Sequence, residues 1–281
     1  HAALVLVVLL TTVISPAALR WRIDSRGPSS VDLDVDSETE PASGWLEVRG
    51  GKIELAANPP TSASARVLLS AAQLAVVNQP SETLLDWIAE RRTRDLAWDR
   101  DATTELLNLL RTSAPRSWRF LEVSGLFDRA IPELAAAIHR RAGDVTELDP
   151  THALRFPTVE ELRSATAVAS SQSDTLLLSA FIADVGASRD ETSIILQKFD
   201  LDLLAAKEIE DLLNGARILR AAVEQEPHRV DDKLLRDIAH GLKRPGIVER
   251  SRLLADAIGG LEPWQHAAMI DITTGVQAVL A

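Results

Sequence analysis

The 281-residue chain contains no cysteine and no tyrosine, and aromatic residues make up only 4% of it. The lack of cysteine excludes disulfides, thiolate zinc sites and a cysteine nucleophile. It also agrees with a reducing compartment, so we expect a cytoplasmic protein. Aromatic and β-branched runs are few, while leucine, alanine, glutamate and arginine are abundant. This composition favours helices, because straight-chain side chains lose little rotamer freedom there.

Positively charged residues are also few. The chain has 30 lysines and arginines against 41 aspartates and glutamates, which gives a formal net charge of −11. Such a field repels phosphate backbones, and no basic patch of useful size opposes it, so we expect no nucleic-acid partner. Apolar residues at 46% and charged residues at 25% are ordinary for a globular protein. Because one domain typically has about 100 to 200 residues, the length predicts two packed regions.

Residues 1–44 combine an apolar segment with an acidic linker. The apolar run Ala2–Ile14 is shorter than the roughly 20 residues that span a bilayer. A buried helix is therefore the first interpretation, with a membrane-directed segment and a strand as alternatives. In the linker, acidic side chains alternate from Asp32 to Glu40. A calcium loop does not fit them, since Ser37 stands where the turn needs glycine and Ser43 where a glutamate should close the shell.

The region 45–147 is predicted to be a β-hairpin followed by helices. Trp45–Val48 and Lys52–Leu55 alternate around a glycine pair, which is typical of a hairpin, and we expect no other sheet. Helical periodicity follows, with one apolar face over Leu68–Ala75. Helix signals are an N-cap at Ser81, a helix start at Asp99 or Asp101, and stops at Gly125 and Gly143.

Turn-forming pairs at Asp149-Pro150 and Phe156-Pro157 place a domain boundary near residue 148. The second domain, 148–281, shows only helical patterns. They predict short helices at 158–170, 174–185, 191–199, 202–213, 216–225, 231–242, 247–258 and 263–280. The expected fold class is therefore all-α, with two helical bundles and one small β-hairpin.

Local catalytic motifs are lacking. The glycine pairs Gly50-Gly51 and Gly259-Gly260 fit a hairpin and a helix end better than a phosphate loop. The chain has no Gly-x-Ser-x-Gly elbow and no His-Glu-x-x-His pair. Its six histidines never stand three or four residues apart, so we expect none to be a metal ligand. We expect no catalytic residue and no cofactor.

One segment carries a family resemblance. Ala183-Asp184-Val185-Gly186, after an apolar helix, resembles the His-Asp-Ile-Gly segment of the HD phosphohydrolase superfamily with alanine in place of histidine. Around it the order of motifs resembles actinobacterial PII nucleotidyltransferases, the uridylyl- or adenylyltransferases of nitrogen signalling. The segments similar to their HD domain are Asp149–His152, Thr158–Leu162, Leu254–Ala257 and Gly259–Trp264. Those similar to the preceding helical region are Trp45–Leu55, Leu68–Ala75 and Phe120–Glu133.

The resemblance, which covers residues 45–280, implies a metal site that this chain has lost in part. Glu161 or Leu162 stands where the family has its first histidine, and Ala183 stands in the His-Asp pair. Asp184 and Asp256 remain as remnant metal positions. Ala187–Ser193 replaces a stretch rich in glycine, lysine and histidine, and Asn214-Gly215-Ala216 stands near a later pair of histidines.

Two carboxylates make a poor site, because a metal-activated water needs several fixed donors. Asp184 can instead have a structural role, as a carboxylate at a helix end that pairs with nearby backbone groups or an arginine. The resemblance thus implies a pseudoenzyme with a degenerate HD-like domain. Nothing before Trp45 supplies a nucleotidyltransferase domain.

We therefore expect a non-catalytic regulatory or interaction module that resembles the middle of a PII nucleotidyltransferase. Its expected partner is a PII-type signalling protein or other domains of a longer chain. One alternative is residual metal-dependent phosphohydrolase activity that removes nucleotide from PII through Asp184 and Asp256. Another is a membrane-tethered binding protein that uses residues 2–14 as its anchor.

Overall fold

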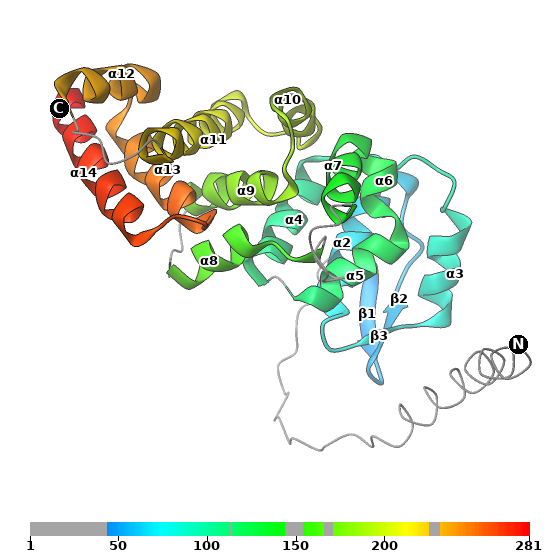
Figure 1. Ribbon diagram of the computed structural model, residues 1–281. Coiled ribbons are helices and arrows are strands. Elements are labelled where there is room, and N and C mark those ends of the chain that lie inside the picture. Colours follow the sequence, from blue (N-terminus) through cyan, green and yellow to red (C-terminus); the bar gives the residue numbers. More distant parts are fainter. Residues whose placement is uncertain (1–43, 113, 144–153, 166–170, 225–230) are drawn as a thin grey trace, which may run out of the picture. The chain divides into compact units, whose positions relative to one another are not determined.

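The computed structural model describes residues 44–112, 114–143, 154–165, 171–224 and 231–281 (Figure 1). The apolar segment, most of the acidic linker and the boundary near residue 148 lie outside the described residues. Within these ranges helices dominate, as the composition predicts, and a small mixed sheet lies near residue 50. None of the described helices is long and apolar enough to cross a membrane.

The sheet contains the predicted hairpin and one further strand. Strands β1 (Leu46–Arg49) and β2 (Lys52–Leu55) pair antiparallel. The glycine pair between them has φ angles of 55° and 74°, which a residue without a Cβ adopts freely. Strand β3 (Gln79–Pro80) pairs parallel with β2, so the expectation of a hairpin alone is wrong. A two-residue strand that contains proline has no alternating pattern to reveal it.

Helices α2 to α7 follow the predicted signals. The Ser81 hydroxyl accepts a hydrogen bond from the Leu84 N–H, and the Asp99 carboxylate accepts one from the Ala102 N–H. Gly125 ends its helix with φ of 64°. The elements are η1 (Thr61–Ala63), α2 (Ser64–Leu74), α3 (Glu82–Glu90), α4 (Arg100–Thr112), α5 (Pro115–Ser124), α6 (Leu126–Ala130) and α7 (Pro132–Ala142).

The second half contains seven helices in its described ranges, and one of them corrects the prediction. They are α8 (Pro157–Ala165), α9 (Ser171–Val185), α10 (Arg189–Lys198), α11 (Leu203–Glu224), α12 (Asp232–Leu242), α13 (Pro245–Ala257) and α14 (Pro263–Leu280). The two helices expected at 202–213 and 216–225 are the single helix α11. Gly215 is a buried residue inside this helix. Its lack of a side chain allows α13 to approach α11 closely.

One connected core joins the described helices, from Leu46 to Val276. At its centre the Trp118 ring on α5 lies 4.5 Å from the Phe156 ring and 5.9 Å from the Phe181 ring, measured between centroids. Phe156 precedes α8 and Phe181 belongs to α9. Side chains on both sides of residue 148 therefore share the same buried cluster.

Candidate functional site

Asp184, the first expected metal position, caps a neighbouring helix. It lies near the end of α9, and its two carboxylate oxygens accept hydrogen bonds from the Thr158 and Val159 N–H groups, each at 3.1 Å. These donors belong to the first turn of α8, where N–H groups lack partners within their own helix and the helix dipole attracts an anion. The half-buried carboxylate thus ties α9 to the start of α8.

Two opposing influences act on the Asp184 carboxyl. Burial raises its pKa above the usual value, because a low-dielectric surrounding disfavours the charged form. Hydrogen bonds from Thr158 and Val159, with the Arg141 guanidinium, act in the opposite direction. Each Asp184 oxygen thus already accepts a hydrogen bond from a backbone donor.

Asp256, the second expected metal position, has different partners. It lies on α13, where one of its oxygens accepts from Arg252 Nη1 at 2.5 Å. Its other oxygen lies 3.0 Å from His266 Nδ1 on α14. Asp256 thus links the end of one helix to the start of the next, and no hydrogen bond joins it to Asp184 among the described residues.

The other expected positions do not complete a metal site. Leu162 is buried and Glu161 is exposed on α8, while Ala183 offers no donor. No three histidine, aspartate or glutamate side chains lie close enough to hold a metal ion in the part of the chain that the structure describes.

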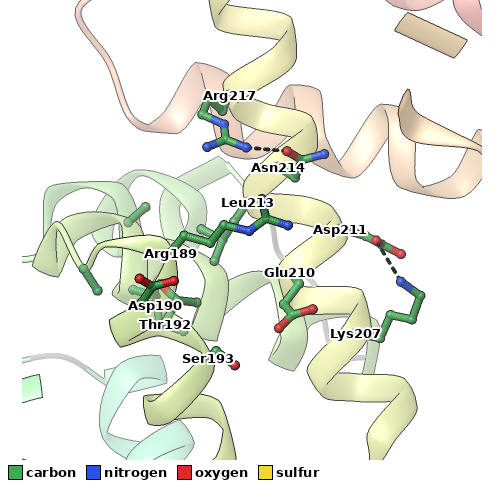
Figure 2. Close-up of a pocket in the computed structure, with 13 residues that line it drawn as sticks. Arg189, Asp190, Thr192, Ser193, Lys207, Glu210, Asp211, Leu213, Asn214 and Arg217 are labelled. Carbon is green, nitrogen blue, oxygen red and sulfur yellow. Dashed lines mark hydrogen bonds and ion pairs between the residues drawn. The ribbon is translucent and has the colours of Figure 1, made fainter. Parts of the chain in front are cut away.

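A cavity of about 580 Å³ lies where α9, α10 and α11 meet (Figure 2). We call it the α9–α11 cavity. Its apolar wall comes from Ile182, Ala183, Ala187 and Leu213, and Asn214 adds an amide. It therefore gathers Ala183, part of the segment 187–193 and Asn214.

Six charged side chains line the α9–α11 cavity, three of each sign: Arg189, Lys207, Arg217, Asp190, Glu210 and Asp211. One pair neutralises itself, since Lys207 Nζ lies 3.4 Å from an Asp211 oxygen, and Asp211 also accepts from Arg244 at 2.8 Å. Among the described residues, the Arg217 guanidinium donates a side-chain hydrogen bond only to the neutral Asn214 amide, at 2.6 Å. Figure 2 shows Arg189 extending from α10 toward α11.

The sequence interpretation missed this cavity, although a signal for it exists. Lys207, Glu210, Asn214 and Arg217 are spaced three, four and three residues apart, which places them on one face of a helix. The polar stripe went unrecognised because the predicted helices stopped at 213 and resumed at 216. With α11 continuous, the four residues of the stripe all line the cavity.

Comparison of the chain with protein-family models, with curated proteins and with solved structures finds no match.

Proposed function

We propose that this chain is a non-catalytic binding module, a regulatory or interaction unit whose second half is a degenerate HD-like helical region. The α9–α11 cavity carries the proposal. Its volume falls within the range of about 300 to 1,000 Å³ that is typical of ligand sites. Its lining combines an apolar wall with charged side chains on facing helices, which suits recognition.

The partners of the two aspartates support binding over hydrolysis. In the superfamily that the chain resembles, hydrolysis requires a metal-activated water, and such a water needs several converging donors. Asp184 is occupied by the first turn of α8, and Asp256 by Arg252 and His266. Ala183, in the place of the family's histidine, leaves the cavity wall apolar at that point.

The resemblance supplies the partner that we propose, a PII-type signalling protein. The places where the family has histidines that this chain lacks include Ala183, the segment 187–193 and the neighbourhood of Asn214, and all three line one cavity, which supports the resemblance in the second half. Loss of those residues together with retention of the cavity is the pattern expected of a pseudoenzyme that still binds.

A paired assay tests the proposal. Purified chain is mixed with unmodified and nucleotide-modified PII protein in the presence of magnesium or manganese. Nucleotide release and hydrolysis of a generic phosphodiester are measured alongside binding by calorimetry. We expect binding of PII without turnover above the protein-free background.

Two results would contradict the proposal. Turnover that disappears in the Asp184→Asn variant would restore the phosphohydrolase alternative, and lack of PII binding by a folded chain would remove the proposed partner. Glu160→Gln is the matched control for turnover, since this exposed acid lies on α8 and occupies none of the expected metal positions.

A further inference from the structure

Four exposed charged side chains that line the α9–α11 cavity have no partner of opposite sign among the described residues. Lys207 and Asp211 neutralise each other, as described above. Arg189, Asp190 and Glu210 make no ion pair or side-chain hydrogen bond with described residues, and the only such partner of Arg217 is the neutral Asn214 amide. Two guanidinium ions and two carboxylates are thus free to act on a ligand.

These free charges belong to two facing helices. Arg189 and Asp190 open α10, while Glu210 and Arg217 lie on the polar stripe of α11, two helical turns apart. Each helix therefore brings one cation and one anion to the cavity, and the labelled side chains in Figure 2 approach it from both. The free cationic and anionic groups balance, so neither a simple anion nor a simple cation satisfies them all.

Neutral groups complete the lining. Thr192 is buried and Ser193 is half-buried, and both belong to α10 and line the cavity. The Arg guanidinium presents a planar fork of donors that matches carboxylate or phosphate oxygens, and a carboxylate accepts hydrogen bonds from an ammonium group.

We propose that the α9–α11 cavity binds a zwitterionic small molecule, one that carries an oxyanion group and an ammonium group. Arg189 and Arg217 hold the oxyanion, and Glu210, with Asp190, holds the ammonium. The apolar wall contacts the carbon chain between them. This inference rests on the proposed binding function, because it names the ligand class of the same cavity.

Two sets of probes test this chemistry at low ionic strength, where exposed charges are least screened. The carboxylate set is 5-aminopentanoate with its singly charged counterparts pentanoate and pentylamine. The phosphate set is O-phosphoethanolamine with ethyl phosphate and ethylamine. Binding to the full chain is followed by chemical-shift changes of isotope-labelled protein. We expect one zwitterion to bind at least about 10-fold more tightly than both of its counterparts.

Single variants assign the two ends of the ligand. Arg217→Ala should weaken the preferred zwitterion about 10-fold and leave the amine counterpart unchanged. Glu210→Gln should weaken the zwitterion similarly and leave the anionic counterpart unchanged. Lys198→Ala on α10 and Glu224→Gln on α11 are matched controls, since both residues are exposed and lie outside the cavity lining.

The outcomes separate this inference from the proposed function. If neither zwitterion binds more tightly than its singly charged counterparts, or if the cavity variants behave as the controls do, the zwitterion site is wrong. Binding of PII without turnover would then leave the proposed function standing. Turnover that depends on Asp184 would instead overturn the proposed function, whatever the probes show.

Discussion

Between Trp98 and Phe199 the helices pack through aromatic rings, whereas α11 to α14 pack through aliphatic side chains and approach closely at two glycines. In the first region, here the aromatic region, five ring pairs have centroids 4.5 to 6.4 Å apart. In the second, here the glycine-packed region, the only aromatic residue is Trp264, and its side chain is exposed. There Arg220 also donates to the Ala255 and Gly259 carbonyls at the end of α13.

The glycines of the second region stand where added atoms would collide. A Cβ at Gly215 would lie 2.2 Å from the Ser251 hydroxyl, and one at Gly275 would lie 2.8 Å from the Leu235 side chain. The two regions should therefore be destabilised by opposite kinds of substitution. Removal of atoms should harm the aromatic region most, and addition of atoms should harm the glycine-packed region most.

The largest effect is expected from Phe181→Ala in the aromatic region. The Phe181 ring is fully buried, and its centroid lies 5.0 Å from Phe156 and 5.9 Å from Trp118. Loss of the ring removes buried apolar surface and leaves a cavity, so the free energy of unfolding should fall by about 3 to 5 kcal/mol. Urea denaturation measures it. Phe120→Ala, at a half-buried position, is the control and should cost less; equal losses would refute the special role of the ring cluster.

Gly215→Ala tests the glycine-packed region. The added methyl should push α13 away from α11, and the free energy of unfolding should fall by about 1 to 3 kcal/mol despite the better helix propensity of alanine. Gly246→Ala is the matched control on α13, since a Cβ there meets nothing within 4 Å. The control should be neutral or stabilising by up to about 1 kcal/mol.

A second substitution tests the cause of that loss. The Ser251 hydroxyl is buried and has no hydrogen-bond partner among the described residues. Adding Ser251→Gly to Gly215→Ala should recover much of the lost stability, because the hydroxyl and Cβ that collide are then gone. If the stability losses of the two single variants simply add in the double variant, close approach of α11 and α13 is not the reason that residue 215 is glycine.

Asp184→Ala tests the link between α8 and α9 inside the aromatic region. It leaves the Thr158 and Val159 N–H groups without their acceptor, so we expect a loss of about 1 kcal/mol, as for other helix N-caps. The accompanying observable is faster amide exchange in the first turn of α8. Unchanged exchange there would mean that Asp184 does not hold the helix start.

The smallest effect concerns Glu191, which joins α10 to α7 through Arg140 with oxygens 2.8 and 2.9 Å from the guanidinium. The Arg140 guanidinium and bonds from Ser188 hold the pKa of Glu191 at about 2, below its usual 4.5. Because the folded-state pKa is depressed, this stabilisation is complete above about pH 4.5 and is lost as the pH falls toward 2.

The matching variant is Glu191→Gln, which retains a side-chain oxygen for the capping box with Ser188. The stability difference between wild type and variant should be present at neutral pH and shrink toward zero near pH 2. Asp190→Asn is the control, because this neighbouring acid has no ion pair among the described residues. A difference that stays constant with pH would exclude the Arg140 contact as its source.

The sequence predicted what depends on neighbours along the chain. The hairpin around Gly50-Gly51, the cap at Ser81 and the stop at Gly125 are local signals, and the structure confirms them. The pairing of β3 with β2 and the continuity of α11 depend on distant residues. The break predicted between residues 213 and 216 is wrong. Gly215 is needed for close packing against Ser251, and this contact cannot be deduced from the sequence because Ser251 lies on another helix.

The same reason limited prediction of the site. Asp184 and Asp256 were singled out by resemblance, but the α8 partners of Asp184 and the α14 partner of Asp256, His266, could not be deduced from spacing. The α9–α11 cavity requires the mutual placement of three helices. Its stripe from Lys207 to Arg217 becomes visible in the sequence only once α11 is treated as one helix.

Metal content tests the central claim most directly, namely that Asp184 and Asp256 hold helices together and do not hold a metal. The full chain is incubated with zinc or manganese, dialysed, and measured by elemental analysis beside its Asp184→Asn variant. The account predicts less than stoichiometric metal in both proteins, because the Asp184 oxygens are directed at the start of α8 and Asp256 at Arg252 and His266. One equivalent of metal in the wild type that is lost in Asp184→Asn would contradict it.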